Sequence, residues 1–291
     1  MLNLWNKNNE KEFFITSMQR YASPEQLFYI TKDKKHLAYW PKKYEGKKTV
    51  LQSRNSLIGK FTEKWTADLV REAVKDKGLF TVQDAVCEEI ALLKSSPADV
   101  LISKTDKARP KPEDILMIIE VKMSIVWNWQ LTAKDNLECK GDYKTHQGNP
   151  GLLRSDTMLK AIGKSINIRV SSNKASGIPI IVMGNTPIKN SYYAKVDHLK
   201  VAGIVQGFWS LNPFPLDEEN KENIKSTEKK GFCRIDTFSE LKESINGILG
   251  EKRDFFSSMK SSKELGLIIA EADKEDTYEK KAEVFLKLIR E

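Results

Sequence analysis

Two charged residues interrupt an apolar stretch of the sequence and could carry chemistry. The apolar run 115–119 ends in Glu120, Val121 and Lys122. Side chains alternate between the two faces of a β-strand, so we expect Glu120 and Lys122 on one face and Val121 on the other. Burying an unpaired carboxylate or ammonium group costs several kcal/mol, so that face needs a compensating charge.

A second apolar stretch supplies that charge, because Asp99 lies near the start of the strand predicted at 98–103. If this strand pairs as an antiparallel hairpin with the strand predicted at 115–123, Asp99 lies beside Glu120. Two carboxylates next to one ammonium group form a hard-oxygen site for Mg²⁺, and the lysine can hold an attacking water. Phosphodiester hydrolysis is the chemistry that needs this arrangement.

The elements that must position these residues follow from the hydrophobic pattern. Apolar residues at helical spacing indicate two helices, the first of which stops at Gly78. Continuous apolar runs bounded by charge or proline indicate strands. The pattern predicts an α/β fold with helices at 60–77 and 152–171 and strands at 80–86, 98–103, 115–123, 178–183 and 201–209.

The first 58 residues form a basic segment that we expect to contact nucleic acid. Between Lys32 and Lys60 there are nine Lys or Arg residues and two acids, which account for +7 of the net charge of +8. Aromatic residues are interleaved with them, a composition that suits contacts to phosphates and sugars. An ordinary solvated lysine-rich loop is the alternative. The DNA-contacting candidates are Lys42, Lys43, Lys47, Lys48 and Arg54, with Arg154 and Lys160 from the start of the second helix.

The remaining chain divides into a core at 59–210 and a C-terminal region at 211–291. Within that region, 212–230 is polar and reads as an exposed insertion or disordered link, and the part after 239 has helical periodicity. We expect the C-terminal region to serve recognition or dimerisation.

Composition indicates a soluble cytoplasmic protein. The three cysteines lack CxxC pairing, the N-terminus lacks the pattern of a signal peptide, and no apolar run approaches membrane-spanning length. The three histidines lack the spacing of metal ligands, and His146 is expected in an exposed loop.

With these residues and elements together, the chain resembles the PD-(D/E)XK nuclease superfamily. The superfamily pattern appears as Pro97-Ala98-Asp99 and Glu120-Val121-Lys122, with Ala98 inserted between the proline and the aspartate. The resemblance also covers the order of elements, which in the superfamily core is a helix, three strands, a helix and a strand. It implies a restriction-endonuclease-like core, a central mixed β-sheet flanked by helices, with N- and C-terminal additions.

The resemblance also implies roles for individual residues. Asp99 and Glu120, helped by the Val121 carbonyl, would bind Mg²⁺, and Lys122 would position the water. Many members add an acid from the first helix, for which Glu63 is the first choice and Glu72 the second. A solvated helix acid is an equally acceptable interpretation of either glutamate.

Within the superfamily, the size and the added terminal segments look most like type II restriction endonucleases. This implies site-specific cleavage of double-stranded DNA to 5′-phosphate and 3′-hydroxyl ends by a homodimer, with a cognate DNA methyltransferase in the same cell. A DNA repair or junction-resolving nuclease of the same superfamily is the alternative enzyme. A non-catalytic DNA-binding protein on that fold is the alternative outside enzymes.

Overall fold

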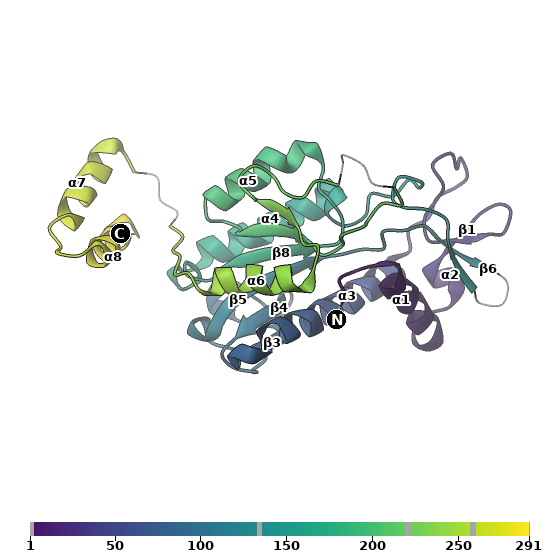
Figure 1. Ribbon diagram of the computed structural model, residues 1–291, viewed down its shortest axis with the longest axis horizontal. Coiled ribbons are helices and arrows are strands. Elements are labelled where there is room, and N and C mark those ends of the chain that lie inside the picture. Colours follow the sequence, from purple (N-terminus) through teal and green to yellow (C-terminus); the bar gives the residue numbers. More distant parts are fainter. Residues whose placement is uncertain (1–2, 133–135, 219–222, 257–259, 291) are drawn as a thin grey trace.

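Six strands form the central sheet of the computed structural model, which describes residues 3–132, 136–218, 223–256 and 260–290 (Figure 1). The strands are β3 (Phe80–Ala85), β4 (Ala98–Ser103), β5 (Ile115–Lys122), β8 (Ile180–Gly184), β9 (Gly207–Ser210) and β10 (Phe232–Arg234). Their order across the sheet is β10-β9-β8-β5-β4-β3. The pairs β3–β4 and β4–β5 are antiparallel, and β5, β8, β9 and β10 run parallel. The sheet is therefore mixed, as the sequence predicted.

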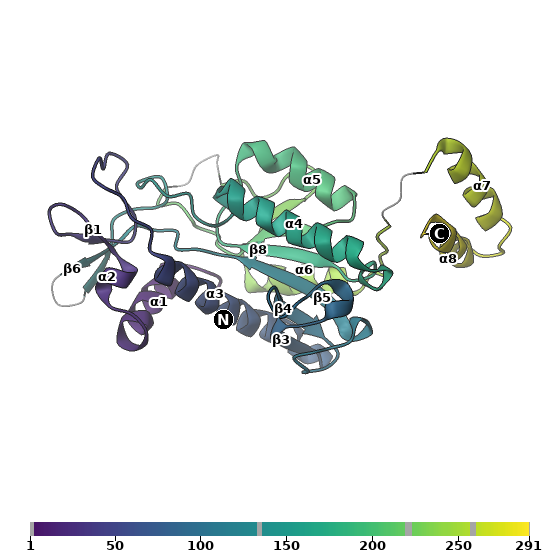
Figure 2. The same ribbon diagram turned by 180° about the vertical axis from the view of Figure 1, so that it is seen from behind.

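Helices cover both faces of this sheet. In Figures 1 and 2, α3 (Gln52–Val74) and α6 (Phe238–Leu249) lie against one face, and α4 (Ser155–Ser171) and α5 (Tyr193–Val201) lie against the other. Successive side chains of β5 point alternately to these layers: Ile119 packs in the core with α3, and Ile118 packs in the core with α4. The fold is thus α/β with three layers.

Most of the elements predicted around the two charged strands are confirmed. The strand at 98–103 has the predicted bounds, and the strand predicted at 115–123 ends at Lys122. The first helix begins earlier than predicted, at Gln52, and a 3₁₀ turn extends it to Gly78, whose φ of +65° ends it. The strand predicted at 201–209 begins only at Gly207, because α5 ends at Val201 and residues 202–206 form the turn that follows it.

A second, four-stranded antiparallel sheet lies at one end of the molecule. It contains β1 (Tyr29–Ile30), β2 (His36–Leu37), β6 (Trp129–Thr132) and β7 (Asn136–Cys139), and it lies near α1 (Lys7–Arg20) and α2 (Pro24–Leu27). Strands β2 and β6 pair directly, so the basic N-terminal segment folds together with residues that follow β5. Residues 1–58 therefore do not form a separate folded unit that ends at the expected boundary.

The expected boundary at residue 210 also moves, because β10 and α6 belong to the central sheet and its covering layer. Part of the polar segment 212–230 is folded against α5: Thr227 Oγ1 donates to the Asp197 carboxylate at 2.5 Å. Residues 219–222 of that segment lie outside the described residues.

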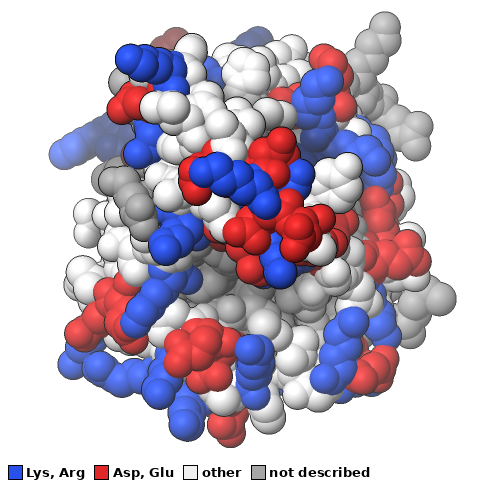
Figure 3. Space-filling model, turned by 90° about the vertical axis from the view of Figure 1, so that its left-hand side faces the viewer, with Lys and Arg blue, Asp and Glu red and all other residues white. Residues whose placement is uncertain are grey.

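Beyond the segment 250–256, α7 (Ser262–Ala272) and α8 (Tyr278–Arg290) form a helical hairpin at the end of the molecule opposite the small sheet. Arg290 contacts Asp254 at 2.6 Å and so attaches the hairpin to that segment. Figure 3 views this end, where basic and acidic side chains are intermingled. Among the described residues, none of the helices has the length and apolar character needed to cross a membrane.

Candidate active site

Asp99 and Glu120 meet where strands β4 and β5 separate. The ladder between these antiparallel strands continues to the pair Val100 and Ile119, so Asp99 and Glu120 are the next residues along. There the Asp99 side chain takes the place of a backbone partner, because the Val121 N–H donates to Asp99 Oδ2 at 2.7 Å. The predicted hairpin is confirmed, and its register places the two carboxylates beside each other.

Two lysines bridge these carboxylates. Lys122 Nζ lies 2.5 Å from Glu120 Oε1 and 3.7 Å from Asp99 Oδ2. Lys164 Nζ, from α4, lies 2.6 Å from Glu120 Oε2 and 3.6 Å from Asp99 Oδ1, and it also donates to the Pro97 carbonyl at 2.7 Å. The four side chains are between 7% and 20% exposed, so this cluster of two acids and two bases is largely shielded from water.

Burial and charge oppose each other in this cluster. Burial raises the pKa of the Asp99 carboxyl, the adjacent Glu120 raises it further, and Lys122 and Lys164 only partly offset both effects. For Lys122, burial alone lowers the pKa, but the charges of Glu120 and Asp99 outweigh it, so the net shift is upward. Lys122 therefore stays protonated beside the two carboxylates.

Lys164 was not predicted as a site residue, although the sequence carried a signal for it. Ala161 and Ile168 are buried on the inner side of α4, three residues before and four residues after Lys164. Helical spacing therefore places Lys164 on the buried side of the helix, where an ammonium group needs a carboxylate partner. That partner comes from a strand more than 40 positions earlier, which no local pattern reveals.

A sharp turn brings the start of α4 to the ends of β5 and β8. Gly151 has a φ of +50°, and a Cβ atom there would lie 3.3 Å from the Lys122 carbonyl oxygen and 3.0 Å from Thr186 Oγ1. Only glycine adopts this conformation at such close approach without strain. The chain then enters α4, which carries Lys164 back over the sheet.

Glu63 lies near the cluster, whereas Glu72 does not join it. The Glu63 carboxylate accepts from Lys60 Nζ at 2.8 Å, and its charge contributes to the raised pKa of Lys122. Glu72, more than two turns further along α3, pairs with the exposed Lys75. Of the two acids named from the first helix, only Glu63 is placed to influence the candidate site.

Four of the predicted DNA-contacting lysines lie on one exposed loop. We call this loop the lysine loop; it contains Lys42, Lys43, Lys47 and Lys48. Its base is held by an aromatic stack, in which Trp40 lies between Tyr29 and Tyr44 with ring centroids 4.7 and 4.4 Å apart. Gln147 Nε2 donates to the Tyr44 carbonyl at 3.1 Å. The backbone of the loop is thus anchored while its four ammonium groups face solvent.

Arg54 and His146, both expected at the surface, are buried instead. The Arg54 guanidinium donates to the carbonyls of Leu27 and Ala38 and lies over the ring of Tyr39, so it is engaged within the protein and not available to phosphate. His146 stacks on Tyr39 with centroids 3.8 Å apart, and burial lowers its pKa to about 4. Both residues stabilise the small sheet. The sequence alone does not indicate this role, because it depends on contacts between distant parts of the chain.

Arg154 and Lys160 lie on the exposed side of the start of α4. Each pairs with Asp156 at 3.2 Å, and their side chains are 54% and 71% exposed. Such exposed pairs contribute little to stability and are easily exchanged for another anion. These two residues therefore remain candidates for contact with phosphate.

The donors at the cluster fit a magnesium ion. Glu120 Oε2 is buried and contacts Lys164 without hydrogen-bond alignment, so this oxygen has capacity for a further cation. Among the described residues, no set of three or more His, Cys, Asp and Glu side chains converges as a metal site. The Val121 carbonyl accepts from Lys122 Nζ at 3.2 Å. Carboxylate and main-chain carbonyl oxygens are the ligand types that Mg²⁺ prefers, since this ion retains several waters and does not need a full cage of protein ligands.

Comparisons with protein families, with curated proteins and with solved structures return no match to this chain. The function must therefore be inferred from the geometry of the site.

Proposed function

We propose that this protein is a Mg²⁺-dependent DNA endonuclease with a PD-(D/E)XK core. The observation that carries the proposal is the meeting of Asp99, Glu120 and Lys122 where β4 and β5 separate. The order of the central elements, α3, β3, β4, β5, α4 and β8, supports it, because this is the superfamily's order of helix, three strands, helix and strand; β6 and β7 of the small sheet are inserted between β5 and α4.

Each residue of the cluster has a distinct task in this reaction. Asp99, Glu120 and the Val121 carbonyl would hold the ion. When bound, Mg²⁺ supplies positive charge to the scissile phosphate and favours ionisation of a bound water. Lys122, which stays protonated, orients the attacking water and stabilises the negative charge that develops on the phosphate. Lys164 pairs with Glu120 and holds its side chain in place, and Glu63 adds negative charge beside Lys122.

The DNA path in this proposal follows the direction of β5. The chain leaves Lys122 and reaches β6 in the small sheet, at the end of the molecule away from the C-terminal hairpin (Figure 1). The lysine loop belongs to that end, and Arg154 and Lys160 flank the turn at Gly151. We propose that these exposed basic groups hold the phosphate backbone.

The restriction type is the form of nuclease we favour, with 5′-phosphate and 3′-hydroxyl products, a cytoplasmic location and a cognate methyltransferase. Cutting both strands symmetrically calls for a homodimer. We propose that the C-terminal hairpin pairs with that of a second copy, because the apolar side chain of Leu267 is 65% exposed on α7. Charge also favours this partner: α7 has two glutamates and one lysine, whereas α8 has four basic and two acidic residues.

Incubation of the full chain with supercoiled plasmid and Mg²⁺ tests the proposal. Discrete linear fragments support a restriction enzyme. Slow nicking, or cutting of a four-way junction in preference to plasmid, supports the alternative repair or junction-resolving nuclease. Binding of DNA without cleavage in Mg²⁺ would contradict both enzyme assignments and support a non-catalytic DNA-binding protein on this fold.

A further inference from the structure

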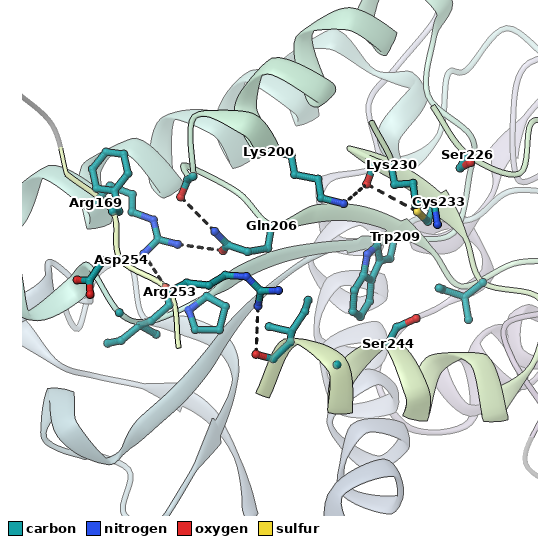
Figure 4. Close-up of a pocket in the computed structure, with 18 of the residues that line it drawn as sticks. Arg169, Lys200, Gln206, Trp209, Ser226, Lys230, Cys233, Ser244, Arg253 and Asp254 are labelled. Carbon is teal, nitrogen blue, oxygen red and sulfur yellow. Dashed lines mark hydrogen bonds between the residues drawn. The ribbon is translucent and has the colours of Figure 1, made fainter. Parts of the chain in front are cut away.

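A cavity of about 710 Å³ lies far along the strands from the Asp99 cluster (Figure 4). Residues 176–179, which precede β8, line it together with Gln206, which precedes β9. Helix α6 and the segment 253–255 form further walls. Asp99 and Glu120 do not line it, so the cavity is separate from the candidate active site. Its volume is that of a pocket for a nucleotide-sized ligand.

The lining of this cavity has an excess of positive charge. Five basic residues face two acids, Glu240 and Asp254. Three of these basic groups have partners within the protein. Lys225 pairs with Glu240, and Arg253 pairs with Glu251. Arg169 donates to backbone carbonyls. The other two are Lys200 and Lys230.

Lys200 and Lys230 make no ion pair with any carboxylate of the described residues. Lys200 Nζ donates to the Lys230 carbonyl at 3.1 Å, as Figure 4 shows. The Asp197 carboxylate, the nearby acid on α5, is occupied by Thr227 Oγ1 and by the backbone N–H groups of Lys229 and Gly231. Two ammonium groups are thus available at one end of the cavity.

The surroundings of Cys233 show that these charges converge. Burial raises the pKa of the Cys233 thiol, and the charges of Lys200, Lys230 and Lys225 partly offset this rise, so all three ammonium groups lie within electrostatic range of one sulfur atom. Trp209 lines the same cavity, and its indole Nε1 lies beside Gly207, where an added Cβ atom would approach it to 2.6 Å. A cluster of ammonium groups at one end of a cavity is complementary to an oxyanion.

We propose that this cavity binds a small organic phosphate of the nucleotide class, with Lys200 and Lys230 holding the phosphate groups. Lysine binds phosphate as a point charge, and the apolar wall formed by Trp209, Ile235 and Ile248 suits the organic part of such a ligand. The proposal does not depend on nuclease activity.

Isothermal titration of the full chain with ATP, with EDTA present to remove divalent metal, tests the site. The chain should bind ATP saturably, and K200Q/K230Q should weaken the affinity by at least about tenfold. The matched control K263Q/K280Q removes the same charge from exposed positions on α7 and α8 and should bind like the wild type. Asp99→Asn should also retain full ATP affinity, which separates this cavity from the candidate active site.

A second variant, Ser244→Glu, adds a negative charge to the α6 wall and should weaken binding equally, so the test does not depend on the folding of one variant. The proposal would be overturned by absence of saturable ATP binding at millimolar concentration. Unchanged affinity in K200Q/K230Q would overturn it as well. Binding of inorganic pyrophosphate but not ATP would contradict the assignment to an organic phosphate.

Discussion

The buried carboxyl group of Glu10 should make the stability of this protein fall as pH rises. Glu10 is fully buried, and its two oxygens accept four hydrogen bonds, from the backbone N–H groups of Val126 and Trp127 and from the indoles of Trp5 and Trp129. Burial raises its pKa from the usual 4.5 to about 7, although these hydrogen bonds oppose the rise. Because Val126 follows Lys122 by four residues, Glu10 also fixes where the chain leaves the candidate active site.

The sign and size of the effect follow from proton linkage. Between pH 4.5 and 7 the folded chain retains a proton on Glu10 that the unfolded chain has lost, so the free energy of unfolding decreases as pH rises. The shift corresponds to about 3 kcal/mol, fully present below pH 4.5 and lost as pH rises through about 7. Glu10→Gln cannot titrate and should lack this component.

Urea denaturation of the wild type and of Glu10→Gln at pH 5 and pH 8 measures the difference. The variant should be less stable at pH 5, by roughly 2–4 kcal/mol, because its NH₂ group accepts no hydrogen bond, whereas both oxygens of the protonated carboxyl can still accept from the surrounding N–H groups. The difference in the free energy of unfolding between the two proteins should shrink by about 2.5 kcal/mol between pH 5 and pH 8. Glu12→Gln, on the exposed side of the same helix, should show the wild-type pH dependence. Parallel pH profiles for wild type and Glu10→Gln would refute this account.

Three further predictions concern activity, DNA binding and assembly. Lys164→Met should lower the single-turnover cleavage rate by about 100-fold without weakening metal-free DNA binding, and an unchanged rate would exclude a role for this lysine. Changing all four lysines of the lysine loop to Gln should reduce the slope of log K against log salt by about 3 in filter-binding titrations; an unchanged slope would remove the loop from the DNA path. Leu267→Glu should convert a dimer to a monomer in light scattering, whereas a monomeric wild type would contradict the proposed pairing.

The two charged strands were predictable from sequence because their signals are local. An apolar run that stops at Glu120 and Lys122 gives a strand, its end and the shared face of both side chains. The position of Asp99 needed only the register of one hairpin with a short loop. The cluster of Asp99, Glu120 and Lys122 therefore follows from neighbouring residues.

The remaining features depend on contacts between distant parts of the chain. Arg54 was predicted at the surface, but its guanidinium is buried against backbone carbonyl oxygens. Because every residue carries such a carbonyl, the sequence does not indicate which ones it contacts. No local pattern marks Glu10, because three of its four hydrogen-bond donors belong to residues 116 to 119 positions later. Lys164 and the cavity beside Trp209 likewise require the packed sheet. Neither the composition nor the hydrophobic periodicity of the sequence indicates these long-range contacts.

Single-turnover cleavage of plasmid DNA by the wild type and by Asp99→Asn in Mg²⁺ tests whether the Asp99 cluster is the active site. This substitution keeps the size of the side chain but removes the negative charge next to Glu120. The account predicts a loss of at least about 1000-fold in rate, with DNA affinity measured without Mg²⁺ unchanged. Cleavage by Asp99→Asn at the wild-type rate would contradict the proposed active site.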